Sequence, residues 1–346
     1  MRFGIVILPQ QPWAEARRLW SGAETLGFDH AWTYDHLSWR SLADEPWGAT
    51  IPTLTAAATV TSTIRLGTFV TSPNFRHPVP FAKEIATVDD IAGGRFLLGV
   101  GSGGTGFDAF VLGYRELSAK ERYERFAEFV TQLDALLRFE TDGPISLEGD
   151  WFTAHEARMV GGPAQLPRVP FVIAANGPKA LALTARYGQG WVTTGRDGAT
   201  GEEWWDSVRE LSSRLDDTGA TVDRYLSFDS GGQYALESVG AFDDLVGRAA
   251  ELGFTDVITH WPRTSGIYAG SESVLEDVAT RIAELRAAEA SSGVAQSGGA
   301  HSGVAQPGVA QSGVAQPGVA QSGVAQSGVA QPGVAQPGVA QPGVAQ

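Results

Sequence analysis

The stretch from Ile64 to Gly101 reads "IRLGTFVTSPNFRHPVPFAKEIATVDDIAGGRFLLGVG" and contains the unit that decides the fold. Residues 64–72 and 95–101 are apolar runs of strand length, and residues 78–94 between them predict a helix. Pro78 stands at the start of this helix and paired glycines stand at its end, both of which are typical boundaries. This order predicts two parallel strands joined by a crossover helix.

The same pattern extends outward in both directions. It gives strands at residues 2–9, 28–36, 64–72, 95–101, 170–176, 190–195, 224–232 and 256–262, and helices at 12–27, 49–62, 78–94, 119–139, 178–188, 202–219, 242–253 and 273–290. Eight strand–helix units predict an α/β fold, a (β/α)8 TIM barrel. A doubly wound open sheet is the alternative. Residues 145–163 interrupt the series after the fourth helix and predict a small hairpin insert.

The C-terminal segment has a different composition. From about residue 291 it repeats the units "GVAQP" and "GVAQS", in which valine is the only sizeable apolar residue. Such a segment cannot build a core, and its Pro-Gly junctions favour turns. We therefore expect a barrel domain over residues 1–290 and a low-complexity, disordered repeat tail over residues 291–346. His301, in one degenerate copy, is interpreted as part of that tail and not as a ligand.

Composition excludes several classes of function. The chain has 346 residues, a formal net charge of -14 and no cysteine. The missing cysteines exclude disulfides, thiolate metal sites and cysteine nucleophiles. The acidic balance disfavours nucleic acid, which is bound through many cationic contacts, and no apolar run approaches the roughly 20 residues that cross a bilayer. We expect a cytoplasmic protein without a membrane or nucleic-acid partner.

The ends of the predicted strands are the candidate site, because active sites of such barrels lie there. The strongest candidates for a role in catalysis are Asp35 and His36, in "WTYDHLSW" (Trp32 to Trp39). The alternative to a site at this pair is that Asp35 caps a helix or loop and His36 only fills space. The other polar or small residues at strand ends are Thr71, Ser72, Gly101 to Gly106, Asn176, Gly177, Thr194, Gly195, Asp229, His260 and Trp261.

Other chemistries fit the sequence poorly. The six histidines include no His-x-His and no pair four residues apart, so no metal site is predicted. "GVGSGG" (Gly99 to Gly104) matches a dinucleotide fingerprint, but no helix begins within it and no second strand with a terminal acid follows. Its glycines instead predict close approach of a flat or phosphorylated ligand to the backbone, and a loop that needs glycine for its dihedral angles is the alternative. His30 and His155 are interpreted as structural or surface residues.

Three segments carry a resemblance to a known family: "GFDHAWTYDH" (27–36), "RLGTFVTSPNFRHPVPFAKEIATVDDIAGGRFLLGVGSG" (65–103) and "VPFVIAANGPKALALTARYGQGWVTTG" (169–195). Together they resemble the luciferase-like monooxygenase superfamily, whose barrel enzymes use FMN or the deazaflavin F420. The similarity spans about residues 2–288. The Asp-His pair that ends the second strand is similar to the F420-dependent branch.

This resemblance implies a role for each matching residue. His36 would lie near the hydride-transfer face as a base or electrostatic partner, able to take the proton of an alcohol, and Asp35 beside it would orient its ring and raise its basicity. A non-prolyl cis peptide bond is implied at Phe69–Val70. Further implied contacts to F420, or alternatively FMN, are Ser102, Gly103, Ala175, Asn176, Gly177 and Thr194. For an anionic tail we nominate Arg40, Arg76 and Arg196, which lie just past the ends of the second, third and sixth strands, with an ordinary solvated rim as the alternative. The candidates for the substrate pocket are Trp39, Trp191, His260 and Trp261, with core packing as the alternative for the tryptophans.

Two departures from the family pattern bear on the reaction. The glucose-6-phosphate dehydrogenases of this branch have a glutamate where the chain has Gly104, so that proton-donating role is vacant unless Asp108 or another group fills it. They also bind the sugar phosphate through lysines, and here only Lys179 lies near a predicted strand end. Glucose 6-phosphate is therefore not the expected substrate.

Three functions stay open at this point. The first and preferred one is an F420-dependent oxidoreductase that transfers a hydride between F420 and a small organic substrate. The second is an FMN-dependent monooxygenase that uses O2 and reduced flavin from a partner reductase. The third is a non-catalytic flavin-binding barrel. The resemblance also implies a homodimer.

Overall fold

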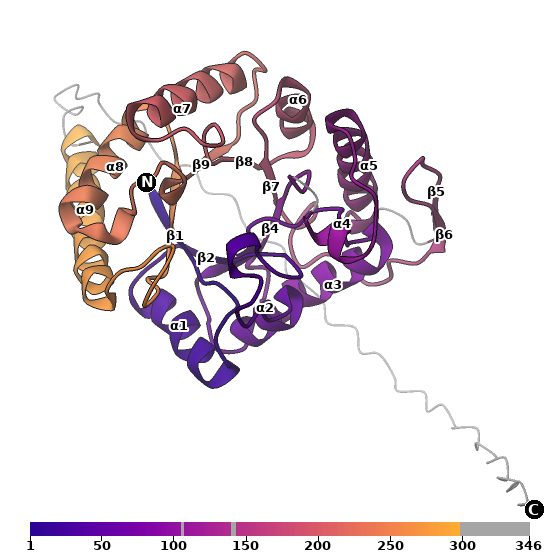
Figure 1. Ribbon diagram of the computed structural model, residues 1–346, viewed down its shortest axis with the longest axis horizontal. Coiled ribbons are helices and arrows are strands. Elements are labelled where there is room, and N and C mark those ends of the chain that lie inside the picture. The colour runs from indigo at the N-terminus through magenta and orange to yellow at the C-terminus, as the bar shows by residue number, and fades with distance from the viewer. Residues whose placement is uncertain (105–106, 140–142, 298–346) are drawn as a thin grey trace, which may run out of the picture. The chain divides into compact units, whose positions relative to one another are not determined.

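The computed structural model confirms the barrel. It describes residues 1–104, 107–139 and 143–297. Eight parallel strands form a closed ring (Figure 1), and the closure rules out the open-sheet alternative. Around the ring the strands are β1 (Arg2–Val6), β2 (His30–Thr33), β3 (Arg65–Thr68), β4 (Phe96–Val100), β7 (Phe171–Ala174), β8 (Gly190–Thr193), β9 (Asp223–Ser227) and β10 (Asp256–His260), which pairs again with β1.

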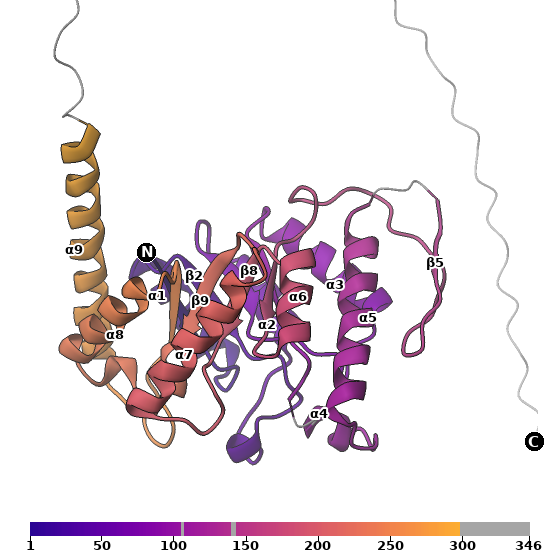
Figure 2. The same ribbon diagram turned by 90° about the horizontal axis from the view of Figure 1, so that it is seen from above.

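A long helix follows each barrel strand and covers the outside of the ring (Figure 2). These helices are α1 (Trp13–Thr25), α2 (Thr50–Ala58), α3 (Pro78–Ile91), α5 (Ala119–Leu137), α6 (Pro178–Tyr187), α7 (Gly201–Asp216), α8 (Val239–Glu251) and α9 (Glu272–Ser297). The helix α9 continues past the predicted domain boundary at residue 290. The rest of the repeat segment, with His301, lies outside the described residues. Within the described ranges, no helix is long and apolar enough to cross a bilayer.

Two excursions leave the repeating pattern. The predicted insert is an antiparallel hairpin of β5 (Ile145–Leu147) and β6 (Ala154–Ala157), and it lies outside α5 (Figure 1). A short helix, α4 (Phe107–Val111), follows β4 and was not predicted, because five residues are too few to show a helical period. Three single 3-10 turns complete the elements: η1 (Arg40–Leu42), η2 (Phe228–Ser230) and η3 (Ala235–Glu237).

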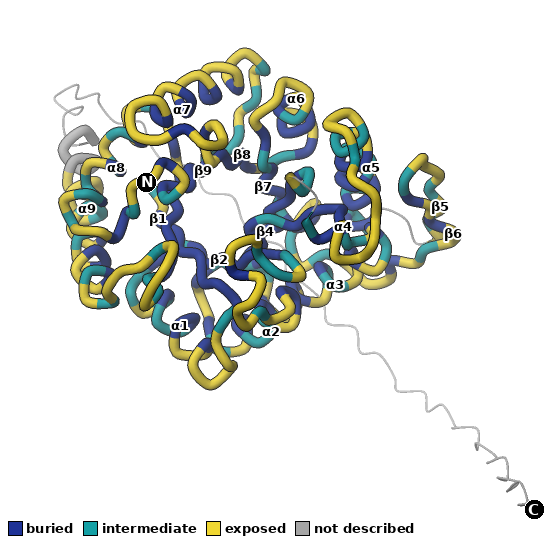
Figure 3. The backbone as a smooth tube through the Cα atoms, in the orientation of Figure 1, coloured by how far each residue is buried: buried dark blue, intermediate teal, exposed yellow. Residues whose placement is uncertain are grey.

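The barrel strands separate two apolar cores. One fills the inside of the ring and includes Trp32, Val192 and Ile258. The other lies between the strands and the helices and includes Trp191 and Trp261. In Figure 3 the barrel strands are mostly buried, while the helices expose their outer faces. Successive side chains on one strand therefore enter different cores, as the two-residue period of a strand requires.

A polar network occupies the N-terminal end of the barrel interior. The Nε1 atom of Trp32 donates a hydrogen bond to Nδ1 of His30 at 2.6 Å, and Nε2 of His30 lies 3.0 Å from Oδ1 of Asp256. Arg2 also donates to that carboxylate, at 2.8 Å. A Cβ atom at Gly4 would lie 2.1 Å from the His30 ring, so the buried imidazole needs glycine there. His30 is structural, and His155 is exposed on the hairpin.

Candidate active site

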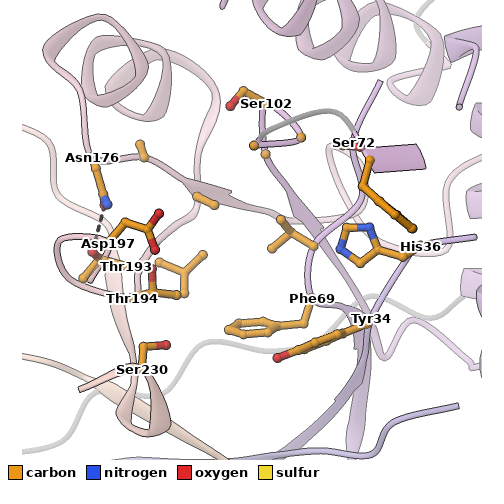
Figure 4. Close-up of a pocket in the computed structure, with 18 of the residues that line it drawn as sticks. Tyr34, His36, Phe69, Ser72, Ser102, Asn176, Thr193, Thr194, Asp197 and Ser230 are labelled. Carbon is orange, nitrogen blue, oxygen red and sulfur yellow. Dashed lines mark hydrogen bonds between the residues drawn. The ribbon is translucent and has the colours of Figure 1, made fainter. Parts of the chain in front are cut away.

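A cavity of about 650 Å³ lies at the C-terminal ends of the barrel strands. Figure 4 shows Tyr34, His36 and Phe69 on one wall and Asn176, Thr193 and Asp197 on the opposite wall. The site residues predicted from the sequence that line it are His36, Trp39, Phe69, Val70, Ser102, Gly103, Ala175, Asn176, Gly177, Thr194 and Arg196. The structure thus brings most of the predicted residues together, while their roles stay predictions.

His36 forms a close pair with Asp108, which lies on α4. The Nδ1 atom of His36 is 2.7 Å from Oδ2 of Asp108, and Oδ1 of Asp108 accepts a hydrogen bond from the backbone N–H of Leu37 at 2.8 Å. Asp108 is only 1% exposed. Because a carboxylate accepts hydrogen bonds, the Nδ1 atom carries a proton in this pair. Nε2 is then the ring nitrogen that is left to exchange a proton at the cavity.

Asp35 does not pair with His36, contrary to the prediction. Its fully buried carboxylate accepts hydrogen bonds from Arg76 at 2.6 Å and from the Thr71 hydroxyl at 2.7 Å, and it does not line the cavity. The physical reason is the two-residue period of extended backbone. Tyr34 and His36 both face the cavity, so the residue between them faces away. The carboxylate that holds the His36 ring is therefore that of Asp108, and not that of Asp35.

The peptide bond between Phe69 and Val70 is cis, as the resemblance implied. Both residues line the cavity, and the Phe69 ring stacks on the Tyr34 ring at a centroid distance of 6.4 Å. A Cβ atom at Gly101 would lie 2.9 Å from a methyl carbon of Val70. The end of β4 therefore needs glycine in order to pack against this part of the wall.

The glycine-rich loop after β4 is held by a side chain. Gly103 has a φ of 87°, and its carbonyl accepts a hydrogen bond from the Asn74 amide at 2.8 Å. A Cβ atom at Gly103 would lie 2.3 Å from the nitrogen of that amide. Arg125 in turn donates to the Asn74 side-chain oxygen. At Gly103, therefore, the group that approaches the backbone closely is the Asn74 side chain, and not a ligand as we predicted.

The opposite wall is built around Asn176. Its amide nitrogen donates to the carbonyl of Gly195 at 2.9 Å, and its oxygen accepts from the Thr193 hydroxyl at 2.9 Å, so β7 and β8 hold it in place. Gly177 follows at the N-cap of α6, where no side chain caps the helix. A Cβ atom at Gly177 would meet no atom within 4 Å. This part of the wall leaves space for a ligand.

The three predicted arginines differ in position. Arg40 lines the cavity, and no ion pair is found for it within the described ranges. Arg196 also lines the cavity, but Glu210 neutralises it at 2.9 Å. Arg76 does not line the cavity, since Asp35 holds it. Only Arg40 among the three thus offers an uncompensated positive charge to the cavity.

Three of the four predicted pocket residues do not line the cavity. The Trp191 indole donates to the carbonyl of Ala175 at 2.7 Å within the outer core, and the Trp261 indole donates to Glu272 at 3.0 Å. Both point toward the helices because Val192 and Ile258 occupy the inward positions of their strands. His260 points inward but lies behind Tyr34, with its Nε2 atom 2.8 Å from the Tyr34 hydroxyl. Trp39 lines the cavity as predicted.

Several lining residues were missed. They include Tyr34, Thr193, Asp197, Ser230 and Tyr268, whereas Ser72, named among the strand ends, does line the cavity. The signal for Tyr34 was present in the sequence, because it stands two residues before His36 on extended backbone. Tyr268 and Ser230 come from the loops after β10 and β9, whose course the strand pattern does not predict.

Comparisons with known proteins identify the family of this chain. The family model for luciferase-like monooxygenases matches residues 1–259. An F420-dependent glucose-6-phosphate dehydrogenase of Beutenbergia cavernae is 36% identical over 225 residues, which is 62% of this chain and 65% of that protein. One of Amycolatopsis mediterranei is 31% identical over 264 residues, with 69% of this chain and 77% of that protein covered. The chain thus spans slightly less than two thirds of the first relative's length.

The fold has solved counterparts as well. The coenzyme F420-dependent tetrahydromethanopterin reductase from Methanopyrus kandleri superposes with a TM-score of 0.62 at 20% identity, over 80% of this chain and 97% of that one. Its barrel is the same fold. With three quarters of its length matched by the family model, this chain belongs to the luciferase-like monooxygenase family.

Proposed function

We propose that this chain is an F420-dependent oxidoreductase that transfers a hydride between the deazaflavin and a small organic substrate. The observation that carries the proposal is the His36–Asp108 pair, with 2.7 Å between Nδ1 and Oδ2, at the wall of a 650 Å³ cavity. The names of the two relatives, both F420-dependent dehydrogenases, support the choice of cofactor.

The cavity suits a flat cofactor with an anionic chain. Phe69 and Val70 give it one apolar wall, and Gly177 leaves open space on the other. Arg40 supplies positive charge for an anionic chain. Bound F420 would supply a ring carbon that accepts or donates a hydride. These residues, with Ser102, Ala175, Asn176 and Thr194, are the ones that would hold it.

His36 exchanges a proton through its Nε2 atom. Asp108 accepts the hydrogen bond from Nδ1 and so fixes the ring orientation and the tautomer. The Trp39 ring lies 4.7 Å from the imidazole and covers part of it. Two neighbours therefore position His36. Asp108 determines which ring nitrogen carries the proton, and Trp39 limits the contact of the ring with water. Asp35 takes no proton step, because its carboxylate holds Arg76.

The lining charges disfavour a phosphorylated substrate. Within the described ranges no lysine lines the cavity, and the Asp197 carboxylate points into it (Figure 4). Arg196 is already paired with Glu210. A sugar phosphate would thus meet a negative charge without a free cation on this wall. We infer a neutral small alcohol or carbonyl compound as the substrate class.

The proposal extends to partners and location. The family resemblance implies a homodimer and a separate F420-reducing or F420-oxidising enzyme that returns the cofactor to its starting state. The cysteine-free sequence favours the cytoplasm. Sedimentation of the full chain at several concentrations would test the dimer.

Hydride transfer tests the proposed function. The full chain is mixed with F420 and a panel of small alcohols, and with reduced F420 and the matching carbonyl compounds, while the visible absorbance of oxidised F420 is followed. We expect transfer with at least one pair, and we expect His36→Ala to abolish it without loss of F420 binding. His155→Ala, on the exposed hairpin, is the matched control. Oxygen consumption with reduced FMN and no transfer with F420 would overturn the proposal in favour of a monooxygenase.

A further inference from the structure

Behind the cavity wall lies a chain of hydrogen bonds that begins at Tyr34. Its hydroxyl is 2.8 Å from Nε2 of His260, and Nδ1 of His260 is 2.8 Å from Oδ2 of Asp229. His260 is 1% exposed, and the Asp229 side chain is also 1% exposed. Both nitrogens of the imidazole are therefore committed inside the protein. Tyr34 lines the cavity and is the link between this buried pair and a ligand.

The direction of each hydrogen bond follows from the carboxylate. Asp229 also accepts hydrogen bonds from the backbone N–H of His260 at 2.8 Å and from the Thr259 hydroxyl at 3.0 Å. Since it accepts from every partner, Nδ1 of His260 carries a proton and Nε2 accepts from Tyr34. The Tyr34 oxygen then accepts from the Tyr268 hydroxyl, 3.2 Å away. In this arrangement Tyr34 can pass its proton inward when it receives one from the cavity.

Tyr268 completes the arrangement and is held there by the loop after β10. Its ring stacks on His260 with 3.7 Å between centroids and 6° between planes. Tyr268 has a φ of 58°, which is uncommon for a residue other than glycine and costs conformational energy. Its carbonyl accepts from the Arg263 N–H at 2.8 Å. Residues kept in such conformations cluster at functional sites, and this one places a second hydroxyl beside Tyr34 at the cavity.

We propose that Tyr34 is a second proton-transfer group of the site, with His260 and Asp229 as its buried proton acceptor. This inference rests on the proposed function. An alcohol that is oxidised loses a proton as well as a hydride, and an acceptor that ends fully reduced gains both. As the alcohol is oxidised, its hydroxyl proton moves to the Tyr34 oxygen, and its hydride would go to the ring carbon that bound F420 supplies. The Tyr34 proton moves to Nε2 of His260, and an imidazolium forms beside Asp229.

This assignment leaves His36 for the proton that the reduced cofactor takes up, which is the role left vacant at Gly104. Burial raises the pKa of Tyr34 well above its usual range, and Tyr268 adds to the effect. Tyr34 is therefore protonated at neutral pH and acts as a relay, not as a free phenolate. The charged and titratable groups around it are His36, Arg40, Asp229, Tyr234, His260, Arg263 and Tyr268.

The test compares Tyr34→Phe with Tyr234→Phe in the full chain. The Tyr234 hydroxyl donates to the backbone carbonyl of His260 at 2.8 Å and does not line the cavity, so it controls for loss of a nearby hydroxyl. We expect Tyr34→Phe to bind F420 normally, to slow hydride transfer about a hundredfold or more, and to lose one limb of the pH profile. Tyr234→Phe should keep both the rate and the profile. An unchanged rate and profile in Tyr34→Phe would overturn the inference.

Nitrogen NMR of histidine-labelled protein without cofactor gives a readout that does not depend on activity. We expect His260 to carry its proton on Nδ1, and the Nε2 shift to change in Tyr34→Phe but not in Tyr234→Phe. If wild-type protein fails to bind F420, the proposed function is wrong. The NMR comparison would still show whether Tyr34 is hydrogen-bonded to His260 as the relay requires. An Nε2 signal that is the same in wild type and Tyr34→Phe would overturn it.

Discussion

The Nδ1 atom of His36 lies 2.7 Å from the Oδ2 atom of Asp108, although 72 positions separate the two residues in the sequence. His36 follows β2, whereas Asp108 lies on the short helix α4 after β4. The barrel brings both to one cavity wall because the C-terminal ends of its parallel strands meet there. This pair, and not the neighbouring Asp35, is the acid–imidazole unit of the site.

Asp108→Asn should therefore impair turnover without impairing folding. Asparagine keeps the shape but replaces a carboxylate that only accepts hydrogen bonds with an amide that can also donate, so Nδ1 of His36 is no longer held in its protonated tautomer. We expect the rate of hydride transfer to fall about a hundredfold or more, with F420 binding retained. Steady-state and single-turnover rates would measure this, and Asp90→Asn, on the exposed side of α3, is the control. Equal rates in Asp108→Asn and wild type would show that the pair takes no part in proton transfer.

Asp35→Ala should act on stability instead. The change removes the buried carboxylate that lies 2.6 Å from the Arg76 guanidinium and leaves Glu84, 3.0 Å away, as its remaining acidic partner. Loss of hydrogen bonds between charged groups costs about 1.5 to 3 kcal/mol of unfolding free energy. Urea unfolding would measure the loss, with Asp90→Ala, at an exposed position of α3, as the control that should unfold as wild type does. If Asp35→Ala is as stable as wild type and binds F420 but transfers no hydride, Asp35 takes part in the reaction.

This difference between neighbours marks the limit of what the sequence predicts. Apolar runs and helix boundaries placed all eight strands and helices, so the strand ends that form the site could be named. Successive side chains at a strand end point alternately to the cavity and to the outer core, so the sequence must also show which of the two alternating sets points inward. It does so for β2 and the residues that follow, where Trp32, Tyr34 and His36 share one face. The position of Trp191 and Trp261 in the outer core follows from the same alternation.

Contacts from loops are a different matter. Asp108 and Tyr268 reach the cavity from segments without a periodic pattern, and the sequence gives their residue types but not their course. The hydrogen bond from Asn74 to Gly103 is of the same kind. Such contacts depend on the packing of distant segments, so only a structure reveals them.

Glu24 should make stability depend on pH at the opposite end of the barrel. Burial alone would raise the pKa of its carboxyl group, but hydrogen bonds from the backbone N–H groups of Ile64, Thr63 and Ser62 lower that pKa from 4.5 to about 2. Because the pKa is lower in the folded state, this stabilisation is complete above the unfolded value and is lost as pH falls toward 2.

The corresponding variant is Glu24→Gln. We expect it to lose about 1 to 2 kcal/mol of unfolding free energy at pH 7, because glutamine cannot accept all three amide hydrogen bonds with a charge. The difference from wild type should shrink as the pH falls from 5 to 2 in urea unfolding experiments. Glu251→Gln, on exposed α8, serves for comparison. A difference that stays constant across this range would argue against a role for the Glu24 charge.

Gly177→Leu should block the cofactor without disturbing the fold. A Cβ atom there meets nothing within 4 Å, and the residue lines the cavity. The added side chain would occupy space that we assign to F420. We expect the F420 dissociation constant to rise at least about tenfold, which corresponds to roughly 1.4 kcal/mol, with an unchanged melting temperature. Gly162→Leu, where a Cβ also meets nothing but lies away from the cavity, should bind as wild type does. If Gly177→Leu binds F420 as tightly as wild type does, F420 does not occupy the space beside Gly177.

An equilibrium titration decides whether this cavity binds F420. F420 fluorescence is followed as the full chain is added, first alone and then in the presence of excess FMN. We expect saturable binding of one F420 per chain, retained in His36→Ala, weakened in Gly177→Leu and not displaced by FMN. Saturable binding of FMN that excludes F420, or F420 binding that Gly177→Leu leaves unchanged, would show that the cavity is not an F420 site.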